Sequence, residues 1–387
     1  MKAGLLGRKL GHSLSPQIHR FFGDYEYRLY EKEPEEVEGL LRTVFADADF
    51  GFLNVTIPYK QTVFELCDEL SPMARKLGNV NFVTRTADGK LRGDNTDAFG
   101  VGRLLDANGI DVRGWNCAIL GAGGAAMTVR AVLEERGAKR VTFVRRGEEP
   151  AQDDDLIVNA TPVGMFPDIN SVRVNILQYV QSKAVLDLVY NPSPTRLVRE
   201  ARACGKIAAD GMVMLIAQAW RAFQLVARTE DRRQKTLFLY GAPASGKSTW
   251  AKRIAAATGW ELVDLDAEIV KAAGRSIPEI FEKEGEKGFR AVEKRCLATV
   301  CVCGDRNVAA PTGRVIALGG GALLDPESRK IAETAGRVVV LDCPLETLKA
   351  RLTGGDRPLS ADTAKLEALV ASRAAHYASF PRSVKMV

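Results

Sequence analysis

One stretch of the sequence combines glycines, a lysine and two hydroxyl groups at a spacing that suits a triphosphate. The segment GAPASGKST at residues 241–249 has the pattern GxxxxGK[ST] and follows the apolar run TLFLY. In such a loop the backbone N–H groups surround phosphate oxygens, the lysine reaches the terminal phosphates, and the hydroxyl after it binds magnesium. We therefore predict ATP and Mg²⁺ binding through Gly241, Ser245, Gly246, Lys247, Ser248 and Thr249.

A second glycine-rich turn has the spacing of a dinucleotide-binding loop. The segment CAILGAGGAAM has an apolar strand before the glycines and a helical pattern after them, and RVTFV follows as another strand. Glycines permit a tight turn and bring a pyrophosphate close to the helix N-terminus, although a merely structural glycine turn is the alternative. Two arginines end the second strand where an NAD-binding protein usually has an acidic residue, so we predict NADP(H). The expected contacts are Gly121, Ala122, Gly123, Gly124, Ala125, Arg145 and Arg146.

Four phrases in the first hundred residues are too polar to belong to a core. They are GHSLSPQIH, NVTIPYK, GNVN and GDNTDAFG, and each has hydroxyl, amide or charged groups beside glycine or proline. Such groups line sites for small polyhydroxylated acids. Together with the glycine loop, these phrases resemble the shikimate dehydrogenase family over roughly residues 1–228.

That resemblance implies reduction of 3-dehydroshikimate to shikimate, with Lys60 and Asp97 as the catalytic pair. An ammonium group beside the carbonyl oxygen can stabilise the developing alkoxide and protonate it, while a carboxylate orients the ammonium. The alternative is that Lys60 is an ordinary solvated lysine. The resemblance implies substrate contacts at Ser13, Ser15, Asn54, Thr56, Asn81, Tyr190 and Gln218, and nicotinamide-side contacts at Thr161, Met212 and Leu215.

The C-terminal part of the chain resembles the shikimate kinase family over roughly residues 236–387. The resemblance rests on the phosphate loop with DLD, SIPEIF, GEKGFR and GGGA. It implies that Asp266 is the base for the acceptor hydroxyl and that Asp264 lies near the metal, although both could be solvated strand-end carboxylates. It also implies that Arg357 covers the transferred phosphoryl group. The implied contacts to shikimate are Arg290, Gly319, Gly320, Gly321 and Arg373.

Length and composition frame these sites within an ordinary α/β protein. A chain of 387 residues exceeds the usual size of one domain, and short apolar runs alternate with helical patterns, which predicts α/β folding with parallel sheets. We expect a substrate-binding domain at 1–97 completed by a helix at 211–228, and a Rossmann-type NADP domain at 98–210. A charged run suggests a linker at 229–235, or else a solvated helix end, before a P-loop kinase-like domain at 236–387.

Charge and cysteine content limit the other classes of function. The net charge of +6 is scattered, so we expect small anionic ligands and no nucleic acid. Seven cysteines without a CxxC pair favour neither a disulfide framework nor a zinc site, and with no signal peptide or apolar span we expect a cytoplasmic location and no membrane association. Oligomeric state stays open.

The two resemblances lead to one functional hypothesis, because the product of the first reaction is the substrate of the second. We predict a bifunctional enzyme that makes shikimate 3-phosphate from 3-dehydroshikimate, NADPH and ATP. Two alternatives stay open: a quinate or dual quinate/shikimate dehydrogenase joined to the kinase, and a non-catalytic metabolite sensor on the same scaffold.

Overall fold

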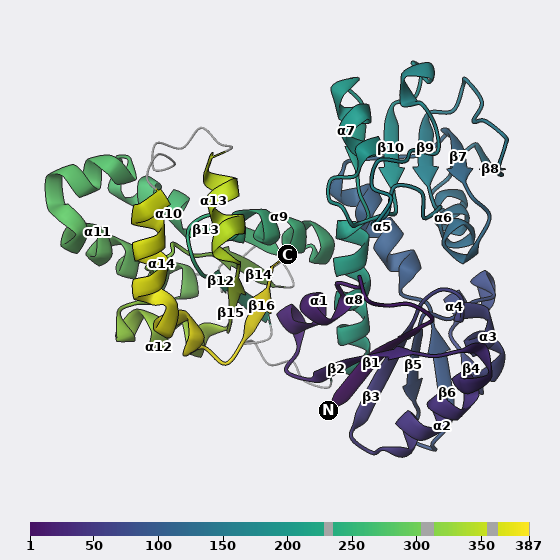
Figure 1. Cartoon of the computed structure of the whole chain (residues 1–387), viewed down its shortest axis with the longest axis horizontal. Helices are drawn as coiled ribbons and strands as arrows, with labels where there is room; N and C mark the ends of the chain where they lie inside the picture. The colour runs from purple at the N-terminus through teal and green to yellow at the C-terminus, as the bar shows by residue number, and fades with distance from the viewer. Residues whose placement is uncertain (228–234, 303–312, 354–362, 387) are drawn as a thin grey trace. The chain divides into compact units, whose positions relative to one another are not determined.

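A computed structural model describes residues 1–227, 235–302, 313–353 and 363–386 (Figure 1). Most of residues 1–227 form one compact unit, and most of the chain after Ala227 forms a second. The expected linker at 229–235 lies outside the described residues except for Lys235. In the described part of the chain, no helix has the length and apolarity that crossing a membrane requires.

The first lobe of the N-terminal unit contains a six-stranded sheet with the order β2-β1-β3-β5-β6-β4. The β1 strand pairs in parallel with β2 and β3, but β5 is antiparallel to both β3 and β6. The prediction of parallel sheets is therefore wrong here, because a short turn containing Gly89 at φ 88° joins β5 to β6, and such turns connect antiparallel strands. The elements are β1 (Lys2–Gly7), α1 (Ser15–Phe22), β2 (Glu26–Glu31), η1 (Pro34–Glu36), α2 (Val37–Ala46), β3 (Phe50–Val55), α3 (Lys60–Leu66), β4 (Glu69–Leu70), α4 (Pro72–Leu77), β5 (Phe82–Arg85) and β6 (Leu91–Asp94).

The second lobe of this unit has a parallel five-stranded sheet with the order β11-β10-β9-β7-β8. The strands expected before and after the glycine loop are confirmed as β7 and β8. The chain reverses its direction of winding between β7 and β9, and ligands of such sheets bind beyond the carboxyl ends of the strands at that point. The elements are α5 (Asp97–Ala107), β7 (Asn116–Leu120), α6 (Gly124–Glu135), β8 (Arg140–Val144), β9 (Leu156–Asn159), η2 (Ile176–Gln178), β10 (Ala184–Asp187), α7 (Arg196–Ala203) and β11 (Ile207–Ala209).

One long helix, α8 (Met212–Val226), connects the two lobes of the N-terminal unit (Figure 1). Met214 near its start packs in the core of the second lobe, whereas Ala222 near its end packs against Phe52 and Phe82 of the first sheet. The helix also packs along α5. The position of α8 agrees with the helix at 211–228 that was expected to complete the substrate-binding domain. The exact domain boundaries remain a prediction.

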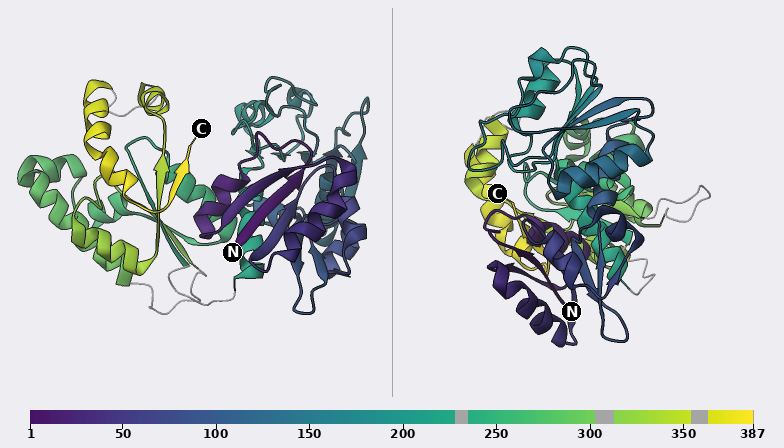
Figure 2. Two further views of the ribbon diagram at one scale, coloured as in Figure 1. Left: turned by 60° about the horizontal axis from the view of Figure 1, so that its bottom comes forward. Right: turned by 90° about the vertical axis from the view of Figure 1, so that its right-hand side faces the viewer.

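The C-terminal unit is built on a parallel five-stranded sheet with the order β13-β14-β12-β15-β16. Helices cover both faces of this sheet (Figure 2). Its central strand β12 has four fully buried residues, and the phosphate loop follows directly after them. The described elements are β12 (Thr236–Tyr240), α9 (Lys247–Thr258), β13 (Glu261–Asp264), α10 (Leu265–Ala273), α11 (Ile277–Val302), β14 (Arg314–Ala317), α12 (Pro326–Ala335), β15 (Arg337–Asp342), α13 (Leu345–Thr353), α14 (Thr363–Ala378) and β16 (Ser383–Lys385).

Candidate active sites

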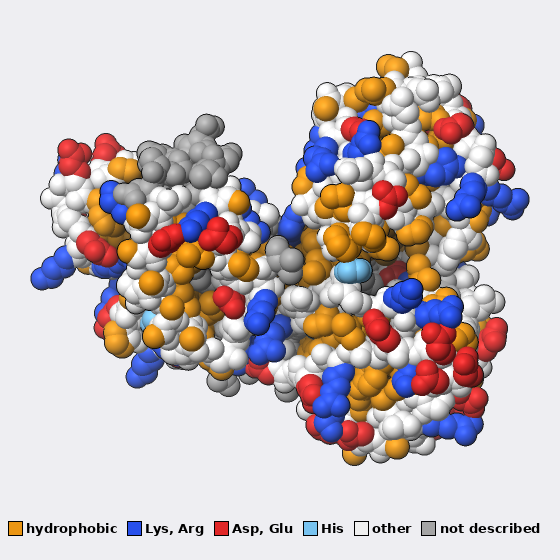
Figure 3. All heavy atoms as spheres, viewed as in Figure 1, with side chains coloured by type: hydrophobic (Ala, Val, Ile, Leu, Met, Phe, Trp, Pro, Cys, Tyr) orange, Lys and Arg blue, Asp and Glu red, His pale blue; other side chains and the backbone are white. Residues whose placement is uncertain are grey.

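A cavity of about 1100 Å³ lies between the two lobes of the N-terminal unit. Figure 3 shows the corresponding hollow, with hydrophobic side chains along its rim. The walls come from both lobes and from α8, so the cavity exists only because the lobes are joined as they are. All nine residues predicted to be catalytic or substrate-binding in this unit line it: Ser13, Ser15, Asn54, Thr56, Lys60, Asn81, Asp97, Tyr190 and Gln218.

The predicted catalytic pair is in direct contact in this cavity. Lys60 is the first residue of α3 and Asp97 the first of α5, and the Lys60 Nζ donates a hydrogen bond to Asp97 Oδ2. The two side chains are 16% and 4% exposed, so this is a largely desolvated ion pair. The arrangement can hold an ammonium group at a defined position beside a bound carbonyl oxygen.

An amide network fixes the wall next to Asp97. Asn81 accepts a hydrogen bond from the Thr96 backbone N–H at 2.7 Å, and its Nδ2 donates to Thr96 Oγ1 at 3.1 Å and to Gln218 Oε1 at 3.3 Å. The bond to Gln218 ties α8 to the start of α5. Since the Gln218 carbonyl is occupied, its NH₂ group is the part that can donate to a ligand.

His19 is a buried residue of this site that the sequence reasoning did not identify. It is 1% exposed, its Nδ1 lies 2.6 Å from Tyr25 Oη, and its Nε2 lies 3.0 Å from Asn54 Nδ2. Burial lowers the pKa of His19 to about 3, so the ring is neutral and accepts at Nε2 from the Asn54 amide. The signal was present in GHSLSPQIH, where His19 lies one helical turn after Ser15.

This histidine determines how Asn54 faces the cavity. The Asn54 Nδ2 also donates to Tyr27 Oη at 3.0 Å, so both of its protons are used. The Asn54 Oδ1 is buried and has no hydrogen-bond partner in the described structure. A buried acceptor without a partner is costly, and a ligand hydroxyl is the group that would satisfy it.

The glycine loop after β7 is shaped to receive a pyrophosphate. Gly121 has a φ of 106°, which favours glycine, and a side chain added there would contact Thr161. Added side chains at Gly123 or Gly124 would meet nothing within 4 Å, and no side chain caps the N-terminus of α6. Open space and free N–H groups at a helix N-terminus suit a phosphate anion.

The two arginines after β8 are exposed, and among the described residues neither side chain has a protein partner. Their backbone, in contrast, is held in place. The Glu148 carboxylate accepts from the Arg145 N–H at 2.7 Å, and Arg173 donates to the carbonyls of Arg145 and Glu148 at 2.7 and 2.8 Å. Arg173 therefore supports the loop that presents Arg145 and Arg146, a role the sequence reasoning missed.

A buried carboxyl group supports the segment expected near the nicotinamide. Asp187 accepts hydrogen bonds from Thr195, the Val189 backbone and Asn159, and Asn159 in turn accepts from the Thr161 hydroxyl at 2.6 Å. Burial raises the pKa of Asp187 to about 6. Thr161 thus lies beside the glycine loop rather than in the cavity wall. Leu215 lines the cavity, but Met212 does not and is only 3% exposed.

In the C-terminal unit the phosphate loop has the backbone that its glycines predict. Gly241 and Gly246 have φ of 132° and 94°, and a side chain on Gly241 would clash with the Leu341 carbonyl at 2.7 Å. Lys247 begins α9, and its Nζ donates to the carbonyls of Gly241 and Ala242 at 3.0 and 2.8 Å. Its ammonium group therefore lies against the loop, where a phosphate would be received. Ser245 is fully buried, whereas Ser248 and Thr249 are exposed.

The oxygen groups predicted to hold magnesium are neighbours. Ser248 Oγ donates to Asp264 Oδ2 at 3.4 Å, and Asp264 also caps α10 by accepting from the Asp266 N–H at 3.1 Å. Asp264 is the last residue of β13, and Asp266 is the second residue of α10. Hydroxyl and carboxylate oxygens beside a phosphate loop fit the ligand preference of Mg²⁺.

The groups predicted to bind the acceptor converge on a residue that was not predicted, Glu293. A side chain added at Gly321 would lie 2.5 Å from Arg290, and one added at Gly319 would lie 2.8 Å from Glu293 and 3.4 Å from Asp266. Glu293 is 2% exposed and ion-paired with Arg290 at 2.5 Å. Its pKa is raised by burial, and this is opposed by Arg290 and, more weakly, by Arg373. The signal was the i, i+3 spacing of Arg290 and Glu293 on α11.

Two further contacts hold the glycine triplet and the phosphate loop of the C-terminal unit. The Tyr377 hydroxyl donates to the Gly320 carbonyl at 2.7 Å and so fixes the glycine triplet from α14. Arg351 of α13 donates to the Ala244 carbonyl of the phosphate loop at 3.4 Å. Neither residue was predicted. Arg357 lies outside the described residues.

Known proteins resemble the two units separately. The family model for the shikimate dehydrogenase substrate-binding domain matches residues 5–83, and that for shikimate kinase matches residues 243–385. The NADP⁺-type shikimate dehydrogenase of Clostridium perfringens is 34% identical over 247 residues, covering 57% of this chain and 90% of the relative. The enzyme of Methanopyrus kandleri is 38% identical over 258 residues, covering 57% and 88%.

Solved structures resemble the N-terminal unit to a similar degree. Shikimate 5-dehydrogenase from Thermus thermophilus, in complex with NADP(H) and shikimate, has a TM-score of 0.54 and 32% identity, covering 59% of this chain and 94% of that chain. Quinate dehydrogenase from Corynebacterium glutamicum, in complex with NAD, has a TM-score of 0.53 and 30% identity, covering 59% and 94%.

Proposed function

This chain belongs to the shikimate dehydrogenase family and carries a shikimate kinase domain behind it, and we propose that it performs two consecutive reactions on one small acid. The first is the NADPH-dependent reduction of 3-dehydroshikimate to shikimate. The second is the ATP-dependent phosphorylation of shikimate to shikimate 3-phosphate. The observation that carries the proposal is the contact of Lys60 with Asp97 in a cavity lined by every predicted substrate-binding residue of that unit.

In the reduction, Lys60 is the proton donor to the carbonyl oxygen. When bound, NADPH supplies a hydride to the carbonyl carbon, and negative charge then develops on the oxygen. The Lys60 ammonium stabilises that charge and transfers its proton, while Asp97 keeps the ammonium oriented and accepts from a neighbouring substrate hydroxyl. Asn54 accepts from another hydroxyl through its unpaired Oδ1, and Ser13 and Ser15 hold the carboxylate.

The preference for NADP(H) rests on Arg145 and Arg146. Two exposed guanidinium groups without partners among the described residues, on a loop held by Arg173, suit the 2′-phosphate of the adenosine ribose. Arg145 directly follows β8, at the position where an acidic side chain would bind a ribose diol.

In the phosphorylation, the residues of the C-terminal unit position groups and neutralise charge. Lys247 moves from its loop carbonyls to the terminal phosphates, Ser248 and Asp264 would hold Mg²⁺, and Asp266 accepts the proton of the attacking hydroxyl. Arg290 and Arg373 bind the carboxylate of shikimate, and Glu293 orients Arg290. Mg²⁺ would neutralise phosphate charge and orient the transferred group.

A second candidate for the first unit is quinate oxidation, because its likeness to a quinate dehydrogenase is close to its likeness to a shikimate dehydrogenase. A non-catalytic sensor is less well supported, since Lys60, Asp97, Lys247 and Asp266 are all present.

The other features of the proposal follow from the two reactions. The partners are the small acids and nucleotides, with no nucleic acid or membrane, and the six described cysteines are free thiols, which suits a reducing cytoplasm. We keep the substrate domain at 1–97 with helix 211–228, the NADP domain at 98–210 and the kinase domain at 236–387 as the working boundaries.

The test uses the purified full chain in separate assays. NADPH consumption with 3-dehydroshikimate and ADP release with shikimate should both be observed. Oxidation of shikimate and quinate, each with NADP⁺ and NAD⁺, distinguishes the two dehydrogenase candidates. Absence of both activities in the folded protein would favour the sensor.

A further inference from the structure

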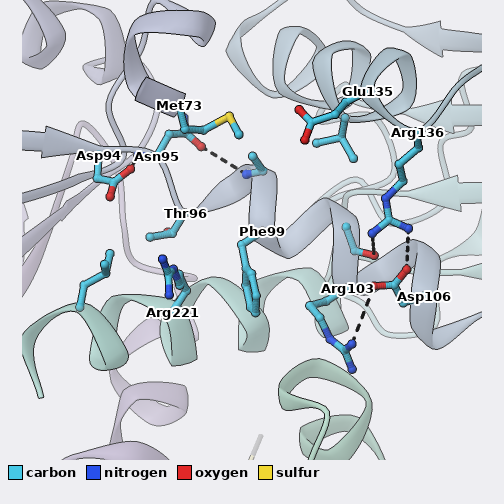
Figure 4. Close-up of a pocket in the computed structure, with 14 residues that line it drawn as sticks. Met73, Asp94, Asn95, Thr96, Phe99, Arg103, Asp106, Glu135, Arg136 and Arg221 are labelled. Atoms are coloured by element: carbon cyan, nitrogen blue, oxygen red, sulfur yellow. Dashed lines mark hydrogen bonds and ion pairs between the residues drawn. The ribbon is translucent and has the colours of Figure 1, made fainter. Parts of the chain in front are cut away.

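A second cavity of the N-terminal unit, of about 400 Å³, shares no residue with the proposed substrate cavity. Its walls come from both lobes and from α8, and Figure 4 shows the side chains that line it. Its volume lies within the range of small-molecule sites. No step of the proposed reactions uses this cavity.

Most charged groups around this cavity already have protein partners. Arg136 pairs with Asp106 at 2.5 Å and donates to the Gly102 carbonyl, and Glu135 pairs with Lys76 at 2.7 Å. Arg103 also lies 3.8 Å from Asp106. These charged groups are therefore paired within the protein.

Two charged groups in the walls are incompletely satisfied, and they have opposite signs. Arg221 of α8 has no hydrogen bond or ion pair to another described residue and only lies over the Phe99 ring, 5.9 Å from its centre. Asp94 accepts two hydrogen bonds through Oδ1, from Ser71 and from the Asn95 N–H, while Oδ2 accepts none from the described residues. No ion pair within 4.0 Å joins Arg221 to Asp94. A ligand that bridges them would therefore need a negative charge for Arg221 and a positive charge for Asp94.

The remaining walls of the cavity are apolar. Met73, Phe99, Val132 and Leu225 come from four different helices and line the cavity. Figure 4 shows two of them, Met73 and Phe99. An aromatic ring and aliphatic side chains of this kind favour an apolar ligand group.

We propose that this cavity binds an apolar α-amino acid. Its carboxylate pairs with Arg221, its ammonium group pairs with Asp94 Oδ2, and its side chain contacts Phe99 and Val132. A ligand with only one charge would leave one of the two protein groups unpaired.

The position of the cavity places this ligand behind the catalytic segment. Asn95 and Thr96 line the second cavity, and both also bond to residues of the substrate cavity. Asn95 accepts from the Asp97 N–H at 3.0 Å, and Thr96 bonds to Asn81. The amino acid therefore binds without competing for the substrate cavity.

Calorimetric titration of the full chain with L-phenylalanine tests the proposal. We expect one binding site, unaffected by saturating shikimate, and affinity reduced by about tenfold or more in Arg221→Met and in Asp94→Asn. The matched control is Arg199→Met, because Arg199 is exposed and lies on α7, away from the cavity walls. Phenylpropionate and phenethylamine, which each lack one charge, should bind at least about tenfold more weakly than L-phenylalanine.

Four results would overturn the assignment: no binding at millimolar concentrations, unchanged binding in Arg221→Met, displacement by shikimate, or equal binding of phenylpropionate. Arg221→Lys separates charge from packing, since it should retain part of the affinity that Arg221→Met loses. Calorimetric binding does not depend on either enzymatic activity. Failure of this proposal can therefore be distinguished from failure of the proposed function.

Discussion

The two candidate active sites differ in how far the protein has assembled them before any ligand arrives. In the N-terminal unit, Lys60 already contacts Asp97, and Asn81 and Asn54 are held by neighbouring side chains in a mostly buried cavity. In the C-terminal unit, Ser248, Thr249 and Asp266 are exposed, and Lys247 rests on the carbonyls of its own loop.

The chemistry explains this difference. Proton delivery to a developing alkoxide needs a donor at a fixed position in a dry site, so the protein itself supplies the ion pair. Phosphoryl transfer is organised largely by the phosphates and the metal ion, so the protein supplies a loop and exposed groups that these ligands arrange. Within the described part of the second unit, the acceptor region around Glu293 is the preassembled one.

The largest expected effect comes from removing the central lysine of each site. Lys60→Met should reduce dehydrogenase kcat by about 10²- to 10⁴-fold and spare the kinase, because the proton donor is lost. Lys247→Ala should reduce ADP release by about 10²-fold or more and spare the dehydrogenase, because a charge on the transferring phosphates is lost.

Steady-state assays of both reactions on each variant measure these effects. The exposed Lys139→Met and Lys271→Ala are matched controls, one for each unit. Loss of both activities in a well-folded variant of either catalytic lysine contradicts the picture of two independent sites.

The second effect concerns an exposed part of the N-terminal site. In the double variant of Arg145→Ala with Arg146→Ala, two charge-assisted hydrogen bonds of about 1.5 kcal/mol each are lost, so kcat/KM for NADPH should fall about 100-fold. Activity with NADH should change little. Arg173→Met should reproduce part of the loss through its effect on the loop. Equal losses with both cofactors would mean that these arginines do not read the 2′-phosphate.

The third effect tests whether preassembly in the N-terminal unit carries a stability cost. Because the folded state raises the pKa of Asp187 from 3.8 to about 6, its protonated form is the one that the fold favours. Its stabilising contribution is therefore present below about pH 4 and is lost as the pH rises through about 6. The total is on the order of 3 kcal/mol.

Thermal unfolding of wild type and Asp187→Asn between pH 4 and 7 measures this contribution. As the pH rises, the unfolding midpoint of the wild type should fall relative to that of Asp187→Asn. The difference between the two midpoints should then become constant. The exposed Asp168→Asn is the control. A difference that is constant over this range rules out Asp187 as the titrating group.

The smallest effect concerns the preassembled part of the C-terminal unit. Glu293→Gln should raise the KM for shikimate about tenfold with a smaller change in kcat, because Arg290 loses its buried ionic partner. Glu286→Gln is the matched control: Glu286 also pairs with Arg290, but its side chain is 66% exposed and such pairs contribute little. Equal effects of the two variants would show that burial of Glu293 does not matter for binding.

Both phosphate-binding loops could be predicted from the sequence because each is a local feature. A strand, a glycine turn and a helix follow one another within about a dozen residues, and the backbone angles of Gly121, Gly241 and Gly246 follow from that spacing. The strands β7 to β10 were predictable for the same reason, since each is a short apolar run bounded by turn residues.

The contacts between distant residues were decided by the tertiary structure. Lys60 meets Asp97 across 37 positions, and Asn81 meets Gln218 across 137, so only the resemblance to a family indicated that they share a site. Residues without such an indication were missed: His19, Arg173 and Glu293 act by holding another residue, and in the sequence they look like any other histidine, arginine or glutamate. Their roles arise from burial and from neighbours that the chain brings together only when the sheets and α8 have packed.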